Sequence, residues 1–152
     1  MKQYVIGCDS IAIHLKDDIK GFLVAKGISI EDKGCFEETE TDNYPSIAKK
    51  VCDDICSSKR VKRGILICGT GIGMAITANK FRGIRAAVCH DTYSAERFAL
   101  SNDGNILCLG ARVIGAELAK KIIMEWVGLE YMDGPSTPKI DEILAIEANN
   151  MI

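Results

Sequence analysis

The chain has 152 residues, of which 47% are hydrophobic and 26% charged, and its formal net charge is -2 at pH 7. Length and composition predict one soluble globular domain over residues 1–152, and the weak net charge argues against nucleic acid as a partner. Residues 1–8 lack the apolar core of a signal peptide, and no run approaches the ~18 apolar residues of a spanning helix. We therefore expect a cytoplasmic protein without a membrane partner.

The seven cysteines are predicted to be free thiols. Their number is odd, four of them lie in or at the end of apolar strand-like runs, and disulfides are rare in the cytoplasm. The chain has only two histidines and no further ligand pairs at zinc spacing. We therefore expect neither a metal nor another cofactor.

Short apolar runs alternate with amphipathic helical stretches along the chain, a pattern typical of βα units and a parallel sheet. Strands are predicted near residues 4–8, 29–32, 64–68, 84–89 and 106–109. Helices are predicted near residues 11–26, 45–58, 75–80, 92–102 and 114–126, with a last helix after the proline-bearing connection 133–138. The predicted class is α/β, with a five-stranded parallel sheet and an extra C-terminal helix.

Particular residues mark the ends of these elements. Asp9 or Ser10 is predicted to cap the first helix, and Asp91 or Thr92 the fourth, because short polar side chains accept the free N–H groups at helix N-termini. The basic segment 59–63 is interpreted as a solvated connection, with contact to a phosphate as the alternative.

Two segments are left without a place in the predicted sheet. The acidic loop 33–44 is long for a compact α/β unit, and loops of that length are often functional. The last helix carries an apolar stripe with no following strand to cover, made of Ile140, Ile143, Leu144 and Ile146. This stripe packs either on a second subunit or on its own domain.

The segment 64–74 is the most informative stretch of the chain. Apolar residues of a buried strand run into Cys68, Thr70 and three alternating glycines, and the pattern then turns helical. Such a junction leaves backbone N–H groups free at a helix N-terminus, where they favour an anion or a developing oxyanion. We call residues 69–73 the glycine loop, and Cys68 immediately precedes it.

In an open parallel sheet, the loops at the carboxyl ends of the strands form the binding crevice. Those ends carry residues 8–10, the acidic loop with Tyr44, residues 68–71, residues 89–91 and residues 110–112. Charged and nucleophilic side chains are therefore predicted to gather on one rim.

A dinucleotide-binding fold is the first alternative, since a glycine-rich turn follows a strand and Asp91 lies at about the expected distance downstream. Against it, Met74 occupies the third glycine position of the fingerprint, and the turn follows the third strand rather than the first.

Over nearly its full length the chain resembles the family of ribose-5-phosphate isomerase B and galactose-6-phosphate isomerase. The resemblance is carried by residues 7–9, 42–45, 64–73, 78–80, 83–86, 102–103 and 109–115. It implies a Rossmann-like three-layer fold and metal-free interconversion of aldose and ketose phosphates through a cis-enediolate. It also implies a homodimer or tetramer whose active sites lie at the subunit interface.

The resemblance assigns roles to individual residues. Cys68 is the proton base, and Thr70 and the backbone N–H groups of the glycine loop hold the enediolate. The implied substrate-binding positions are Asp9, Ser10, Tyr44, Gly69, Gly71, Ile72, Gly73, Asn102 and Arg112. Asn102 and Arg112 are expected from the neighbouring subunit.

The chain departs from the family pattern at the residues that open the sugar ring and clamp the phosphate. Ser10 and Ser101 stand where the family usually has histidines, so the ring-opening histidine is absent. Near the start of the last helix only Lys139 is cationic, and a lysine does not reproduce bidentate binding by arginine. His14 and His90 are candidate replacements, although His14 is interpreted as a surface residue beside Asp18.

Three functional hypotheses follow. The chain is an isomerase for a related phosphorylated sugar that needs little ring opening, one subunit of a heteromer of the galactose-6-phosphate isomerase type, or a non-catalytic sugar-phosphate-binding protein.

Overall fold

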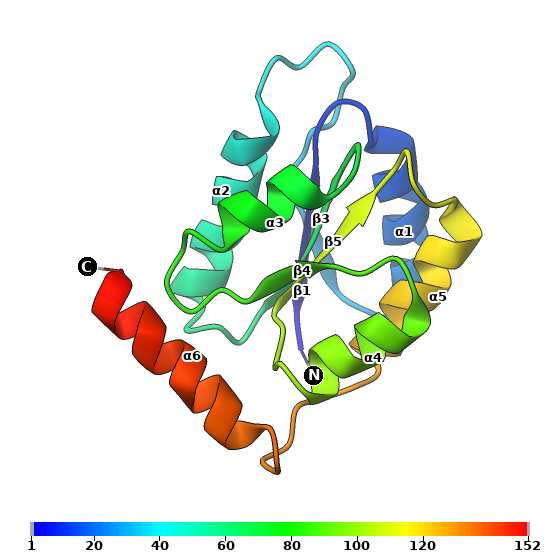
Figure 1. Cartoon of the computed structure of the whole chain (residues 1–152). Coiled ribbons are helices and arrows are strands. Elements are labelled where there is room, and N and C mark those ends of the chain that lie inside the picture. The colour runs from blue at the N-terminus through cyan, green and yellow to red at the C-terminus, as the bar shows by residue number, and fades with distance from the viewer. Residues whose placement is uncertain (1, 152) are drawn as a thin grey trace.

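The computed structural model describes residues 2–151 and has a parallel sheet with helices on both faces (Figure 1). The strands are β1 (Tyr4–Cys8), β2 (Ile30–Asp32), β3 (Arg63–Cys68), β4 (Ala86–Val88) and β5 (Ile106–Gly110). The helices are α1 (Ile13–Ala25), α2 (Tyr44–Ser57), α3 (Ile72–Ala78), α4 (Thr92–Leu100), α5 (Ala116–Val127) and α6 (Thr137–Asn150). The predicted α/β class and five-stranded parallel sheet are confirmed.

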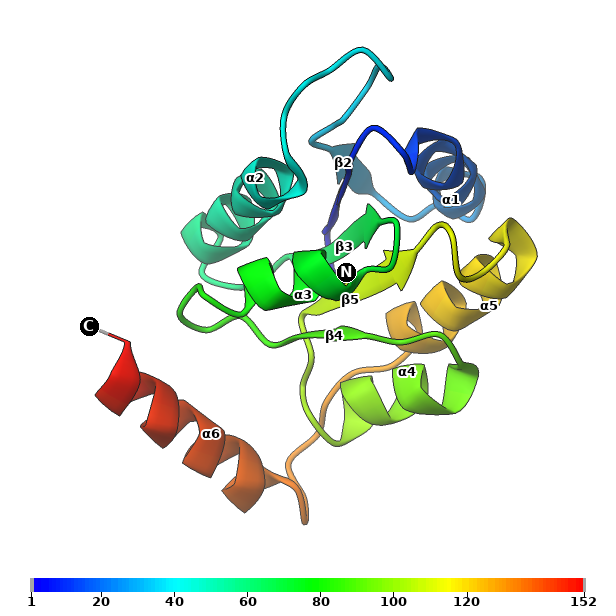
Figure 2. The ribbon, with the colours of Figure 1, turned by 45° about the horizontal axis from the view of Figure 1, so that its top comes forward.

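The five strands are arranged in the order β2-β1-β3-β5-β4, and every neighbouring pair is parallel. Figure 2 shows α2 and α3 on one face of the sheet and α1, α4 and α5 on the other. Because both faces are covered, β1, β3 and β5 are buried along their whole length and show no alternation of polar and apolar residues. Because β1, β3 and β5 are adjacent and parallel, their carboxyl ends lie side by side at the same end of the sheet.

Trp126 of α5 anchors the layer on the α4 and α5 side of the sheet. Its fully buried ring stacks on Phe98 at a centroid distance of 6.3 Å and meets the edge of Tyr4 at 5.9 Å. Its indole N–H donates to the Gly104 carbonyl at 3.3 Å, so its one polar group is paired.

The interpretation of segment 59–63 as a solvated connection is wrong for Arg63. This residue is only 2% exposed, because its guanidinium lies 5.0 Å from the Trp126 ring and donates to the carbonyls of Trp126 and Leu129 at 3.2 and 3.0 Å. The buried backbone carbonyls give the guanidinium partners that a sequence pattern does not reveal.

The predicted cap of the first helix is also wrong, whereas the cap of the fourth helix is confirmed. The Asp9 carboxylate accepts the Ile11 N–H at 3.1 Å in a turn that precedes α1, so Ala12 becomes the N-cap residue. Asp91 caps α4 by accepting the Ser94 N–H at 2.6 Å. Because Asp9 does not cap α1, its side chain stays at the carboxyl end of β1.

The apolar stripe of α6 is left largely uncovered by the described part of the chain. Ile140 is buried, but Ile143, Leu144 and Ile146 are exposed. Both views show α6 standing apart from the helices that cover the sheet (Figures 1 and 2).

The remaining sequence predictions concern the thiols and the membrane. All seven cysteines are free, as predicted. Among the helices of residues 2–151, none has the length and apolar character needed to cross a membrane.

Candidate active site

A pocket of about 430 Å³ opens at the carboxyl ends of β1 and β3. It is lined by Asp9, Tyr44, Cys68, Gly69, Thr70, Ile72, Gly73 and Ile76. All of these except Ile76 are predicted site residues, and they come from three separate segments of the chain. Ile76 follows Ile72 by one helical turn on α3, so its position on the same exposed face is the signal by which it could have been found.

Cys68 is the last residue of β3 and lies at the base of this pocket. Its side chain is 5% exposed, and its sulfur accepts the Gly71 N–H at a distance of 3.1 Å. The loop that follows thus folds back over the sulfur before α3 begins at Ile72. A backbone donor aimed at the sulfur is suited to a group that carries negative charge during a reaction.

The glycine loop owes its shape to close backbone contacts. Gly71 has a left-handed conformation with φ of 79°, and a Cβ atom there would lie 2.9 Å from the Leu109 carbonyl carbon. A Cβ atom on Gly110 would lie 2.7 Å from Thr70 Cα. The loop after β3 and the end of β5 therefore pack directly against each other, and side chains at these positions would separate them.

Tyr44 reaches the pocket from the first residue of α2. Its ring lies so close to Gly73 that any Cβ atom at position 73 would overlap it. The acidic loop 33–43 therefore delivers Tyr44 to the glycine loop, which gives that long connection a structural role.

Asp9 and Arg112 supply opposite charges at the pocket. Partial burial raises the pKa of Asp9, whereas the N–H groups of Ile11 and Ala12 and the charge of Arg112 act to lower it. The Arg112 N–H donates to the Gly69 carbonyl at 3.0 Å, and a Cβ atom on Gly69 would lie 3.6 Å from Arg112 Cδ. Arg112 therefore lies beside Gly69 of its own chain, and its expected place in the site of a neighbouring subunit stays a prediction.

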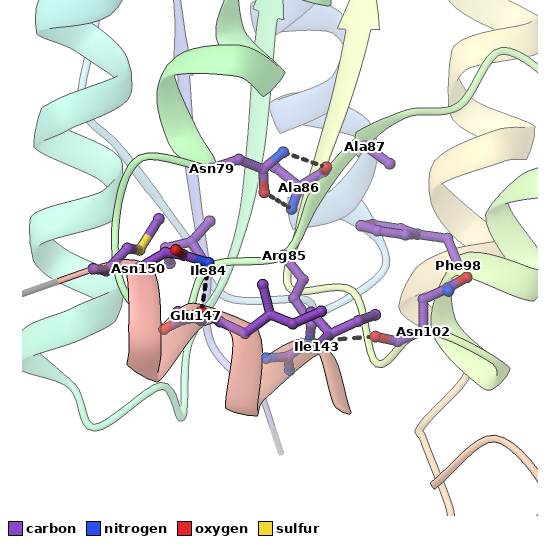
Figure 3. Close-up of a pocket in the computed structure, with 12 residues that line it drawn as sticks. Asn79, Ile84, Arg85, Ala86, Ala87, Phe98, Asn102, Ile143, Glu147 and Asn150 are labelled. Carbon is purple, nitrogen blue, oxygen red and sulfur yellow. Dashed lines mark hydrogen bonds between the residues drawn. The ribbon is translucent and has the colours of Figure 1, made fainter. Parts of the chain in front are cut away.

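Asn102 lies near the amino ends of β4 and β5, at the opposite end of the sheet from Cys68. Helix α4 runs back from the carboxyl end of β4, and Asn102 follows its last turn, where its backbone carbonyl accepts the Arg85 Nε–H at 3.2 Å (Figure 3). Asn102 lines a second pocket, of about 510 Å³, together with residues of α6. Within one chain, the fold thus separates Asn102 from Cys68.

Neither His14 nor His90 lines the pocket. The His14 side chain is 91% exposed and lies 3.5 Å from Glu38, so its surface position is confirmed while its partner is Glu38 rather than the predicted Asp18. His90 follows β4, and its Nε2 accepts the Gly110 N–H at 2.9 Å. Ser10, which stands where the family usually has a histidine, is partly exposed in the turn before α1.

Residues 4–143 match the family model described as Ribose/Galactose Isomerase, and the chain belongs to this family. It is 49% identical over 143 residues to D-erythrulose-4-phosphate isomerase of Pectobacterium atrosepticum, covering 94% of this chain and 93% of the relative. It is 44% identical over 147 residues to ribose-5-phosphate isomerase B of Escherichia coli, covering 97% of both chains.

Solved structures agree with this assignment. Ribose-5-phosphate isomerase B of Clostridium thermocellum superposes with a TM-score of 0.90 at 39% identity, over 97% of this chain and 98% of that chain. The enzyme of Mycoplasma genitalium with bound ribulose-5-phosphate superposes with a TM-score of 0.92 at 29% identity, over 97% of both chains. The predicted Rossmann-like fold is thereby confirmed, and the resemblance recognised in the sequence is correct.

Proposed function

We propose that the chain is an aldose–ketose isomerase of the ribose-5-phosphate isomerase B type, acting through a cis-enediolate on a four-carbon sugar phosphate such as D-erythrulose 4-phosphate. The observation that carries this proposal is a pocket that keeps Cys68 beside the glycine loop while serines occupy both histidine positions. A second relative, from Mycolicibacterium smegmatis, is 40% identical over 146 residues and is named D-erythrulose-4-phosphate isomerase 2.

The chemistry of a tetrose 4-phosphate explains why a ring-opening acid is dispensable. Ribose 5-phosphate closes a five-membered ring through its free hydroxyl on C4. In a tetrose 4-phosphate that oxygen carries the phosphate, so the sugar stays open and presents its carbonyl directly. An enzyme for this substrate needs a proton base and an enediolate cradle, which are the parts that this chain keeps.

Cys68 is the proton base in the proposed mechanism. As a thiolate it removes the proton from the carbon next to the carbonyl, and the electron pair of that C–H bond forms the double bond of the enediolate. The backbone N–H groups of the glycine loop and the Thr70 hydroxyl stabilise the enediolate oxygens. Cys68 then returns the proton to the neighbouring carbon while a proton moves from one enediolate oxygen to the other, which completes the isomerisation without any net redox change.

Other pocket residues bind and orient the substrate. Tyr44 packs across Gly73 at one side of the pocket, and Asp9 lies on the side of β1, where its carboxylate exchanges protons with the substrate hydroxyls. Arg112 beside Gly69 supplies a positive charge for the phosphate. Ser10, Gly69, Gly71 and Ile72 complete the proposed binding positions.

Exchange of the carbon-bound proton with deuterated solvent tests the base step separately from ring opening. We expect exchange to be faster on D-erythrulose 4-phosphate than on ribose or hexose phosphates. Cys68→Ala is expected to slow exchange by about 10²- to 10⁴-fold, the usual contribution of a general base. Cys56→Ala is the matched control, since this thiol contacts the Arg82 carbonyl outside the pocket. Exchange that survives intact in Cys68→Ala would contradict the proposal.

We further propose that residues 1–152 form one sugar-phosphate isomerase domain that assembles at least into a homodimer in the cytoplasm. The position of Asn102 supports a shared site, since it lies at the edge opposite to Cys68 of its own chain and reaches such a site only in a second copy. The exposed stripe of α6 offers an apolar surface for that contact.

The same observation leaves a heteromer as a second candidate, with a different chain supplying the opposite face of the site. Complementation distinguishes the two assemblies. Cys68→Ala and Asn102→Ala chains, each inactive alone, are expected to regain activity when they are unfolded together and refolded as a mixture, because the mixed dimer holds one intact site. Wild-type chain that is inactive until a second polypeptide is added would support the heteromer.

A further inference from the structure

His90 lies where the pairing of β4 with β5 stops. The ladder between the two strands runs through Val88 and Cys108, and the Cys89 N–H donates to the Cys108 carbonyl at 3.3 Å. In a regular parallel ladder, the next N–H of β5, on Gly110, would bond to a backbone carbonyl of β4. Here the imidazole Nε2 of His90 takes that place at 2.9 Å.

Gly110 begins the turn that packs against Cys68 and the glycine loop. The Ala111 N–H donates to the Cys68 carbonyl at 2.8 Å, and the Arg112 N–H donates to the Gly69 carbonyl at 3.0 Å. The Gly110 backbone also packs against Thr70 so closely that a Cβ atom would lie 2.7 Å from its Cα. A displacement of Gly110 would therefore move both Arg112 and the loop that carries the proposed base.

The bond from Gly110 requires one protonation state of His90. An imidazole nitrogen accepts a hydrogen bond only when it is unprotonated, so the proton of the neutral ring must lie on Nδ1. Burial lowers the pKa of His90, which favours this neutral ring. Among residues 2–151, Asp91 is the charged group that acts on this pKa, and it raises it, although the Asp91 carboxylate is itself engaged by Ser94.

We propose that neutral His90 is a positioning residue, which holds the Gly110–Arg112 turn against the Cys68–Gly71 loop and so ties the geometry of the pocket to its own protonation state. Protonation of Nε2 would place two N–H groups against each other and release the turn. His90 acts through Gly110 in this proposal and does not touch the substrate. Its effect on turnover rests on the proposed isomerase function, whereas its tautomer does not.

Nitrogen NMR of the ¹⁵N-histidine-labelled protein tests the bond without any substrate. The chain has only two histidines, so a His14→Ala variant assigns both rings. At pH 7.5 we expect Nε2 of His90 to have the chemical shift of an unprotonated nitrogen and Nδ1 to carry the proton, with a pKa below the ordinary value of a histidine. A proton on Nε2 of His90 at that pH would overturn the proposal, whatever the enzyme's substrate is.

Substitution of His90 tests the consequence for catalysis. His90→Ala is expected to lower kcat by about 10- to 100-fold, the size of effect produced by a small misplacement of catalytic groups. His90→Gln is expected to recover most of that loss, because its amide oxygen can accept the Gly110 N–H. His14→Ala is expected to match the wild type, since this side chain is 91% exposed.

The dependence of kcat on pH separates positioning from a general loss of stability. In the wild type, kcat is expected to fall as pH drops through the NMR midpoint of His90. In His90→Gln that inflection is expected to vanish, because an amide does not titrate. A retained inflection in His90→Gln, or full activity in His90→Ala, would refute the positioning role.

Discussion

Gly73 is a residue whose missing side chain shapes the pocket. Gly73→Ala would place a methyl group on the Tyr44 ring, so Tyr44 must move away from the glycine loop. We expect kcat/KM on D-erythrulose 4-phosphate to fall by about tenfold or more through misplacement of the substrate. Steady-state kinetics measures this loss.

Gly21→Ala is the matched control for that substitution. Gly21 lies in α1, and a Cβ atom there meets open space among the described residues. The change is expected to raise the free energy of unfolding by about 0.5–1 kcal/mol, because alanine favours helix more than glycine does, and to leave kcat/KM unchanged. Equal kcat/KM for the two variants would disprove the role given to Tyr44.

Ser101 tests why the ring-opening histidine is missing. Ser101→His restores the residue that the family resemblance places beside Asn102. We expect turnover of ribose 5-phosphate to rise relative to turnover of D-erythrulose 4-phosphate, because only the former must open a ring. Parallel assays of both substrates measure the ratio, and Ser94→His, at a serine occupied by the Asp91 cap, is the control. An unchanged ratio would argue against ring opening as the reason for the substitution.

His90 also predicts a dependence of stability on pH. Its pKa is lowered in the fold, so the unfolded chain binds the proton first as pH falls. Stability rises with pH wherever the unfolded state binds more protons, so this group makes the free energy of unfolding decrease as pH drops below about 6.5. Urea unfolding at several pH values is expected to show a smaller decrease in His90→Gln than in the wild type. An equal decrease in the free energy of unfolding of the two proteins would contradict a lowered pKa of His90 in the fold.

At the scale of elements, the β3–α3 loop depends on its contact with β5. Gly71 and Gly27 share a left-handed conformation, with φ of 79° and 77°, but only Gly71 lies against the backbone of Leu109. Alanine costs about 1–2 kcal/mol at either site from the conformation alone. Overpacking against Leu109 is expected to add about 1–3 kcal/mol to the cost of Gly71→Ala, as measured by urea unfolding. Similar costs for the two variants would show that the loop and β5 separate easily.

At the scale of the whole molecule, α6 is predicted to hold the assembly together. Ile143→Glu places a charge in the exposed apolar stripe, and it is expected to shift the protein towards monomer in sedimentation velocity. Activity should fall with the dimer fraction, because Asn102 then no longer reaches the site of a second copy. Glu142→Gln, at an exposed polar position on the same helix, is the control. A monomer that keeps full activity would exclude the shared site.

Local patterns in the sequence were sufficient for the order and type of the elements. The buried runs of β1, β3 and β5, the cap at Asp91 and the glycine junction after Cys68 each depend on neighbouring residues, so their signals are readable along the chain. For the same reason, the pocket residues Asp9, Tyr44, Cys68 and Thr70 were found from their positions at strand ends and in loops, with the family resemblance supplying their roles.

The tertiary structure decided those features that depend on groups distant in sequence. Arg63 is buried because carbonyls of α5 and the following loop receive its guanidinium. Arg112 lies beside Gly69 because the turns after β3 and β5 adjoin in the sheet, whereas Asn102 is carried to the opposite edge by α4. The bond between His90 and Gly110 likewise exists only where β4 ends beside β5. The sequence by itself therefore determined the elements and the chemistry of the cysteine loop, and only the packing of the strands decided which distant groups surround it.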